Sequence, residues 1–280
     1  MEGYKIPPVF HHYQEALGRD NITLAVVDDD DPLNFVNPAT DVVLLRTASR
    51  SLVNTIRKIR VRSTAEDYDK YTLVADKTLL SDYLKCEKIL VPKQYYIDEI
   101  INGRTYFVKP RFGSESFGIS DKSICRSKSE ILTQLDFLKN NLKAESVIEE
   151  FIPGSDCTVA CYRDPTSGEI KTYAIEVECF SAGGIQTHEG KISYDEFCVV
   201  MFDNDKKRIE EISRRVFQIL DIKHHSRFDF RKTADGRLFL IDVNLIPGLG
   251  PLGDFAKCML LTDNHSYIDM LNAVINSASI

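Results

Sequence analysis

The chain contains 280 residues with a net charge of -7, and its apolar and charged fractions are those of an ordinary globular protein of one or two domains. No dense run of lysine or arginine offsets the acidic balance, and the apolar runs are far too short to span a bilayer, so we expect neither nucleic acid nor a membrane as partner. The N-terminal residues lack the apolar stretch of a signal peptide, and the seven cysteines form no C-x-x-C pair, which favours buried thiols in the cytoplasm over disulfides or zinc.

Residues 1–72 predict a small open α/β unit. The apolar runs 22–27 and 41–46 are typical of buried strands, and the spacing in 49–59 predicts a helix with Ser49 as its N-cap. A dinucleotide site requires glycines after the first strand, and none stand there. The chain also has no G-x-x-x-x-G-K-[ST] sequence, so a P-loop is excluded as the phosphate cradle.

The rest of the chain predicts a mixture of α-helices and paired strands. Periodicity indicates helices over 69–85, 129–142 and 206–220, and strands over 105–110, 146–154, 157–164, 169–180, 226–231 and 237–244. The turn Ala234-Asp235-Gly236 predicts that the last two strands form a hairpin. A loop rich in glycine and proline, IPGLGPLGD, then precedes a terminal helical segment.

The final hairpin carries the most distinctive polar pattern. Because side chains alternate along a strand, Arg227, Asp229 and Arg231 share one face of the first strand. Asp242 and Asn244 share one face of the second strand. Three oxygen donors and an arginine can therefore converge, which suits Mg²⁺ bound together with substrate phosphates. The alternative is a solvated polar face of a hairpin.

A lysine at the end of a strand is followed by a loop rich in glycine and serine. Lys109 ends the strand, and Ser114 and Ser116 lie between Gly113 and Gly118. The backbone N–H groups of such a loop can cover phosphates while the lysine pairs with them. The alternative is a surface loop beside a solvated lysine.

Two adjacent acids stand in the strand that precedes a Pro-Gly turn. Glu149 and Glu150 point to opposite faces, so one of them is expected to face the interior. A buried carboxylate needs a partner, which makes a role in a site plausible. An edge strand with both acids in water is the alternative.

These motifs, in this order, resemble the ATP-grasp enzymes, and among them the D-alanine–D-alanine ligase-like branch. The resemblance rests on residues 75–77 (ADK), 107–120 (FVKPRFGSESFGIS), 148–160 (IEEFIPGSDCTVA), 226–231 (SRFDFR) and 240–251 (LIDVNLIPGLGP). It covers roughly the last three quarters of the chain.

The resemblance implies an α+β ATP-grasp fold in which two α+β lobes enclose ATP. Residues 1–72 would form a short N-terminal substrate domain with an open α/β sheet. Residues 73–147 would form the small lobe with the Gly/Ser lid, and 148–280 the C-terminal catalytic lobe. Family members are often homodimers, so a homodimer is implied as well.

The resemblance also assigns residues to the adenosine part of ATP. Glu149 matches the acid that accepts from the adenine amino group. Glu150 and Ile152 fall on the hinge whose backbone binds the base. Asp156 matches an acid that binds the ribose hydroxyls, where the family more often has glutamate.

The phosphates are assigned in the same way. Lys77 and Lys109 match lysines that reach the phosphates and the adenine side. Ser114 and Ser116 belong to the segment that matches the lid over the triphosphate. Lys191 resembles a further lysine that contacts phosphate.

The reacting centre completes the resemblance. Arg227 matches the arginine that stabilises the transferring phosphoryl group. Asp229, Asp242 and Asn244 match the ligands of two Mg²⁺ ions, which Mn²⁺ can replace. Gly248 falls where the family's backbone helps to form the oxyanion and acceptor site. Asp242 departs from the family, which usually has glutamate there.

The implied activity is an ATP-dependent carboxylate–amine ligase acting on small molecules, amino acids among them. Two alternatives remain open from the residues. One is a kinase like the inositol phosphate kinases, which resemble this chain at IDVN-x-x-PG but lack the EEFIPGSD pattern. The other is an ATP-binding partner protein without activity. Arg46, at a strand end, is a candidate for pairing with a substrate carboxylate, although a surface arginine is the ordinary interpretation.

Overall fold

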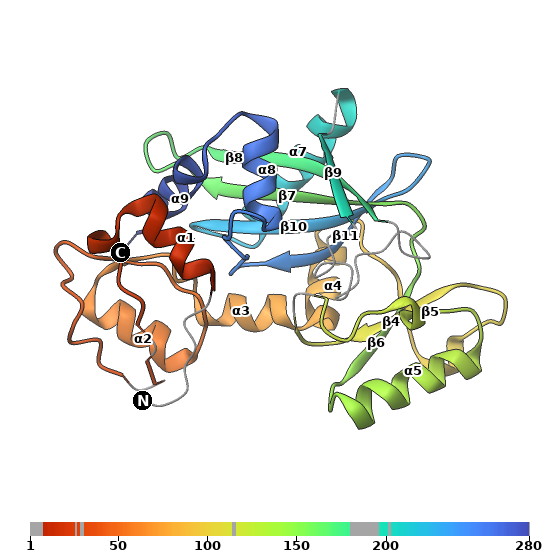
Figure 1. The fold of residues 1–280 in the computed structure, drawn as a ribbon. Helices are drawn as coiled ribbons and strands as arrows, with labels where there is room; N and C mark the ends of the chain where they lie inside the picture. The colour runs from red at the N-terminus through yellow and green to blue at the C-terminus, as the bar shows by residue number, and fades with distance from the viewer. Residues whose placement is uncertain are drawn as a thin grey trace.

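The computed structural model describes residues 8–25, 27–28, 31–113, 116–179, 196–200 and 203–279. Two antiparallel sheets and a small parallel pair form its framework (Figure 1). The helices are α1 (Pro8–Leu17), α2 (Arg50–Ile59), α3 (Tyr68–Ala75), α4 (Lys77–Cys86), α5 (Lys128–Asn141), α7 (Asp203–Ile219), α8 (Asp254–Thr262) and α9 (Tyr267–Asn276). Among these residues no helix combines the length and the apolar character that a membrane span requires.

The strands are β1 (Val42–Val43), β2 (Arg62–Ser63), β3 (Gln94–Tyr95), β4 (Tyr106–Pro110), β5 (Ile124–Cys125), β6 (Ser146–Glu150), β7 (Ser155–Arg163), β8 (Ile170–Cys179), β9 (Glu196–Val200), β10 (His225–Lys232) and β11 (Leu238–Asn244). The larger sheet has the order β11-β10-β7-β8-β9 and the smaller sheet the order β3-β6-β4-β5. The predicted hairpin 226–244 is confirmed as β10 and β11, and the predicted α+β class is confirmed with it.

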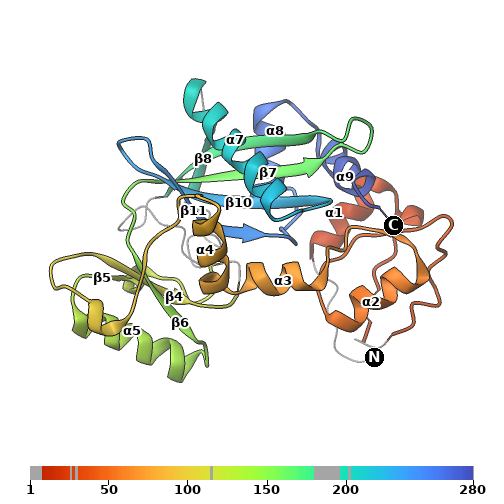
Figure 2. The ribbon, with the colours of Figure 1, turned by 180° about the vertical axis from the view of Figure 1, so that it is seen from behind.

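The larger sheet is covered on both faces. Alternation along β7 places Val159 and Cys161 in the core that α7 shares, while Ala160 and Tyr162 join the core that α8 shares. Figure 1 shows α8 in front of the sheet, and Figure 2, from behind, shows α7 in front. The α8 face is also the face of the polar side chains of β10, because Phe228 on that strand belongs to the α7 core.

A β-bulge in the hairpin keeps its polar and apolar residues apart. Asp229 stands opposite Asp242, yet the next residue, Phe230, stands opposite Leu240, so Ile241 is the extra residue. Without the bulge, strict alternation would turn Leu240 to the same face as Asp242. The bulge instead lets Leu240 enter the core with Phe230 while Asp242 faces Asp229.

The smaller sheet packs one face against α5. Tyr106 and Val108 of β4 form a core with Ile131 and Leu138 of α5. The intervening residues of β4 point to the opposite face, toward the larger sheet. The predicted boundary between the lobes at residue 147 lies inside β6, which pairs with β4, so the change from one sheet to the other occurs after Glu150.

The N-terminal part has fewer residues in strands than the sequence predicts. The helix expected over 49–59 is confirmed, and the Ser49 hydroxyl caps it by accepting from the Leu52 amide at 3.2 Å. The strand expected over 41–46 is reduced to β1, which pairs in parallel with β2. The strand expected over 22–27 is wrong for its described residues, because 23–25 are exposed and no partner strand covers them.

The single helix expected over 69–85 is two helices. Asp76 has an extended backbone and separates α3 from α4. Its carboxylate accepts from the amides of Thr78 at 3.0 Å and Leu79 at 3.3 Å, so it is the N-cap of α4. Lys77 therefore stands in the first turn of α4.

Candidate functional site

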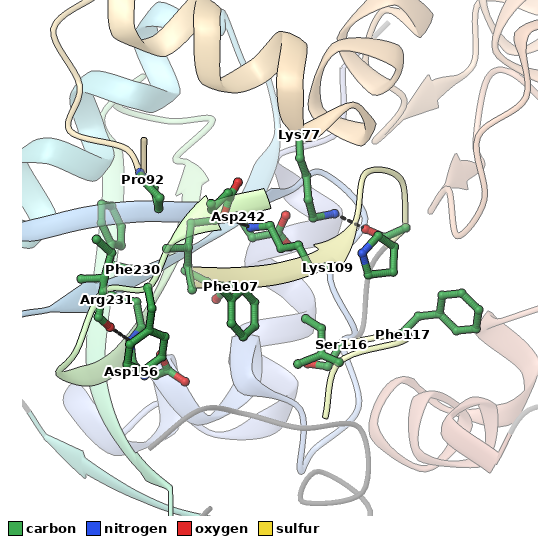
Figure 3. Close-up of a pocket in the computed structure, with 18 of the residues that line it drawn as sticks. Lys77, Pro92, Phe107, Lys109, Ser116, Phe117, Asp156, Phe230, Arg231 and Asp242 are labelled. Atoms are coloured by element: carbon green, nitrogen blue, oxygen red, sulfur yellow. Dashed lines mark hydrogen bonds and ion pairs between the residues drawn. The ribbon is translucent and has the colours of Figure 1, made fainter. Parts of the chain in front are cut away.

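A cavity of about 960 Å³, counting the solvent at its mouth, lies between the two sheets (Figure 3). The smaller sheet contributes Phe107, Lys109, Glu149 and Glu150, and the larger sheet contributes Asp156, Thr158, Arg227, Asp229, Arg231 and Asp242. The other described predicted residues on its wall are Lys77, Ser116 and Ile152. Residues separated by up to 165 positions in the chain are thus brought to one place.

The start of α4 is fixed to the end of β4. The Arg111 guanidinium donates to both oxygens of Asp76, at 2.8 and 2.6 Å, and this pair holds the pKa of the Asp76 carboxyl below its usual value. The Lys77 ammonium donates to the Gly113 carbonyl at 2.7 Å. Two cationic side chains, Lys77 and Lys109, consequently face the same cavity, as Figure 3 shows.

Lys109 and Glu149 form a buried ion pair. The ammonium nitrogen lies 2.8 Å from the Glu149 carboxylate, and each side chain is only 6% exposed. Gln94 donates to the other Glu149 oxygen at 3.3 Å and to the Lys77 carbonyl at 3.1 Å. Glu149 is therefore the interior member of the acid pair, and its carboxylate orients Lys109.

The segment 151–154 joins the two sheets and lies along the cavity wall. Glu150, just before it, accepts from the Lys93 amide at 2.9 Å. Arg231 of β10 donates to the carbonyls of Ile152 at 3.1 Å and Gly154 at 2.6 Å, and to the Asp156 carboxylate at 2.7 Å. This segment, which we call the hinge segment, is held by β10.

Arg227 and Asp229 bind each other on the larger sheet. The guanidinium donates to both Asp229 oxygens at 3.0 and 2.8 Å, and Thr158 donates to Asp229 at 3.1 Å. Asp254 of α8 lies 3.8 Å from Arg227. Burial lowers the pKa of Arg227, but Asp229 and Asp254 outweigh it and hold the pKa above its ordinary value, so the site keeps a permanent cation.

Asp242 stands opposite Asp229 and near both lysines. Burial raises the pKa of the Asp242 carboxyl, Lys77 opposes the rise, and Asp229 adds to it. Burial lowers the pKa of Lys77, which Asp242 partly offsets. Two neighbouring carboxylates repel each other, and a divalent cation relieves that repulsion.

The donor set at this point fits Mg²⁺. Within the described part of the chain, no three His, Cys, Asp or Glu side chains gather into an all-protein metal cluster. Two carboxylates completed by substrate phosphates are the usual way in which proteins hold Mg²⁺. Asp229 and Asp242 supply such a pair of hard oxygen ligands.

Two predicted site residues that the structure describes, Asn244 and Gly248, are not among those that line the cavity. The Asn244 side chain accepts from the Ile246 amide at 3.0 Å, so it closes the turn after β11. Gly248 lies in that same loop and is not among the residues that line the cavity. Ser114 and Lys191 fall outside the described residues.

Two arginines that organise the site received no role from the sequence. Arg231 shares a face with Arg227 and Asp229, so the alternation of β10 was a signal that it points toward the site. Arg111 follows the lysine strand directly, but its partner Asp76 lies 35 residues away. Such a pairing cannot be read from local spacing.

The sequence model of the family described as "D-ala D-ala ligase C-terminus" matches residues 92–276. Among curated proteins, the D-alanine--D-alanine ligase of Aquifex aeolicus is 33% identical over 150 residues, which are 52% of this chain and 47% of that protein. The enzyme of the same name from Fervidobacterium nodosum is 30% identical over 209 residues, 69% of this chain and 59% of that protein. This chain thus spans about half the length of the curated relatives it matches.

Solved structures share the fold. The D-alanine--D-alanine ligase of Bacillus anthracis complexed with ATP has a TM-score of 0.65 at 20% identity, covering 85% of this chain and 78% of that one. The VanG D-Ala:D-Ser ligase of Enterococcus faecalis has a TM-score of 0.66 at 20% identity, covering 85% and 72%. The fold is therefore the ATP-grasp arrangement that the sequence resemblance implies.

Proposed function

We propose that this chain, which belongs to the D-ala D-ala ligase C-terminus family, is an ATP-dependent ligase that joins a carboxylate to an amine. The observation that carries the proposal is the cavity between the two sheets. It gathers Lys77, Lys109 and Arg227 opposite Asp229 and Asp242, and so combines cations for phosphates with oxygen ligands for a metal. Because buried charges cost free energy, a cluster of cations and carboxylates around one cavity supports a charged ligand.

The adenosine part of ATP is proposed to lie along the hinge segment. Phe107 and Ile152 line the cavity there and offer apolar contacts to the base. The backbone of Glu150 and Ile152 supplies hydrogen-bonding groups, and Asp156 supplies a carboxylate for the ribose hydroxyls. Glu149 keeps its proposed contact with the adenine amino group, and its ion pair with Lys109 supports a second task, which is to orient that lysine.

The phosphates are proposed to lie on Lys77 and Lys109, with Ser116 in the loop that closes over them. Lys191 and Ser114 keep their proposed contacts with phosphate from the sequence resemblance alone. Gly248, in the loop after β11, would meet the substrates, and Asn244, at the end of β11, keeps its proposed role as a metal ligand. Arg227 is proposed to neutralise the phosphoryl group during transfer, and its raised pKa, which keeps it cationic, supports that role.

The reaction then has two steps. The substrate carboxylate attacks the γ-phosphorus of ATP, which forms an acyl phosphate and releases ADP. The amine attacks the acyl carbon, the phosphate leaves, and one proton is lost from the nitrogen as the amide forms. When bound at Asp229 and Asp242, two Mg²⁺ ions, or Mn²⁺ in their place, would neutralise charge on the phosphoryl oxygens. The protein groups orient the reactants and exclude water.

Amino acids are the proposed substrates. The curated relatives are named as D-alanine--D-alanine ligases, which supports an amino acid as both acid and amine. Arg46, the candidate partner of a substrate carboxylate, follows β1 and is exposed to solvent. We also retain the division into an N-terminal domain (1–72) and two ATP-binding lobes, with the second boundary moved to the hinge segment because β6 belongs to the smaller sheet.

The test is incubation with ATP, Mg²⁺ and a panel of amino acids, read by mass spectrometry and phosphate release. The expected product has the summed mass of two substrates less one water, with one phosphate released per product. A phosphorylated small molecule would make the chain a kinase, and tight ATP binding without product on the whole panel would make it a binding protein. An Asp242→Ala variant is the control, and it should lose the product.

A further inference from the structure

Arg231 is buried at the point where the two sheets join. Its residue is only 4% exposed, and it lines the cavity. It stands on β10 directly opposite Asp156 of β7. Figure 3 shows the two side chains side by side, with the ion pair between them.

Each of the three guanidinium nitrogens of Arg231 donates a hydrogen bond to a different acceptor. Nε donates to the Ile152 carbonyl at 3.1 Å, Nη2 to the Gly154 carbonyl at 2.6 Å, and Nη1 to Asp156 Oδ1 at 2.7 Å. The planar guanidinium holds these acceptors at fixed relative positions, which a lysine ammonium cannot do. One side chain thus fixes both the hinge segment and the first acid of β7.

The hinge segment also packs closely against β10 at Gly154. Gly154 has φ +150, and a Cβ added there would lie 2.0 Å from the Lys232 carbonyl oxygen. The close approach brings the Gly154 carbonyl within reach of Arg231. The position of the segment is therefore set by β10 of the larger sheet, although it leaves β6 of the smaller sheet.

We propose that Arg231 is a positioning residue for the nucleotide: it holds Asp156 and the hinge segment in place so that the ribose hydroxyls meet an acceptor that is already oriented. This inference rests on the proposed use of ATP by the same cavity. A preset acceptor strengthens binding because less conformational freedom is lost when the nucleotide arrives. Without Arg231, Asp156, a residue that is 7% exposed, would lose a buried cation that orients its carboxylate.

The test is calorimetric binding of ATP and of 2′,3′-dideoxy-ATP, which lacks both hydroxyls, to the full chain. The wild type should bind ATP more tightly than the dideoxy analogue. Arg231→Met should weaken ATP about 10- to 100-fold, the range of a hydrogen bond to a charged group, and change the dideoxy analogue far less. The ratio of the two dissociation constants should then fall toward one, as it should in Asp156→Asn.

Two further variants separate positioning from general destabilisation. Arg163, at the far end of β7, donates to the carbonyls of Gly168 and Ile222, both at 3.2 Å, and lies outside the cavity lining. Arg163→Met should lower the melting temperature without changing the ratio. Arg231→Lys keeps the charge and, should the Met variant fail to fold, must show the same fall in the ratio.

The outcomes are distinguishable. An equal loss of affinity for both nucleotides in the Arg231 variants, or an unchanged ratio, would overturn the inference. A wild type that binds both nucleotides equally would overturn it as well. A wild type that binds neither nucleotide would instead contradict the proposed function.

Discussion

A single methyl group added at Gly154 should disturb the junction of the two sheets strongly. An alanine Cβ would lie 2.0 Å from the carbonyl oxygen and 2.7 Å from the carbonyl carbon of Lys232, and the backbone φ of +150 is one that side chains rarely adopt. The backbone strain contributes about 1–3 kcal/mol, and forcing apart packed backbone adds a similar amount. We therefore expect Gly154→Ala to destabilise the fold by about 3–5 kcal/mol.

The matched control is Gly168→Ala in the turn between β7 and β8. Gly168 also has a positive φ, +72, but an added Cβ there meets nothing within 4 Å. It should cost only the backbone term, about 1 kcal/mol. Urea unfolding followed by circular dichroism measures both, and at 2–4 °C per kcal/mol the Gly154 variant should also melt on the order of 10 °C lower. A difference of under 1 kcal/mol between the two variants would refute the close-packing argument.

Three further predictions concern stability and the reacting centre. Burial, aided by Arg46 and His224, lowers the pKa of His225 from 6.5 to about 3, so the fold holds it neutral while the unfolded chain takes up a proton. The contribution of neutral His225 to the free energy of unfolding is complete above pH 6.5 and is lost as the pH falls toward 3, with about 2 kcal/mol lost by pH 5. His225→Phe should therefore remove this pH dependence when urea unfolding is compared at pH 7.5 and pH 5. The control is His12→Gln at an exposed position, which should leave the pH dependence unchanged. Asp242→Asn should lower Mg²⁺-dependent phosphate release about 10²- to 10³-fold with little change in melting temperature, and full activity would contradict the metal role. A Cβ added at Gly248 meets nothing within 4 Å, so Gly248→Ala should change the free energy of unfolding by no more than about 0.5 kcal/mol. The same variant should lower kcat/KM. An unchanged kcat/KM would contradict the placement of Gly248 in the acceptor site.

The elements that the sequence predicts well are those whose own residues determine them. The helix 50–59 has a serine cap and a strong apolar stripe, and it forms as expected. The run 22–27 is as apolar as a buried strand, but a strand also needs a partner, and the described residues 23–25 are exposed. A run of apolar residues cannot reveal whether a neighbouring strand exists. The long helix expected over 69–85 is interrupted at Asp76, whose backbone is extended and whose carboxylate accepts from Arg111.

The candidate site follows the same rule. The acids of β10 and β11 could be placed together because a short turn sets the hairpin register, and Asp229 does stand opposite Asp242. The tasks of Arg111 and Arg231 depend on partners 35 and 75 positions away, so no local pattern contains them. Most of the predicted site residues do line one cavity, whereas the sequence assigned no task to the two arginines that hold its walls.

The bulge at Ile241 explains why side-chain alternation predicts the face of Asn244 from Asp242 correctly but fails for Leu240. Alternation counted from Asp242 correctly places Asn244 on the same face, but counted in the other direction it would place Leu240 there too. Leu240 is instead 3% exposed in the core with Phe230. In β11, Asp242 can face the cavity while Leu240 stays in the core because one extra residue, Ile241, lies between them. Restoring strict alternation would therefore either expose Leu240 or bury Asp242 away from Asp229, and in both cases the carboxylate pair would be lost.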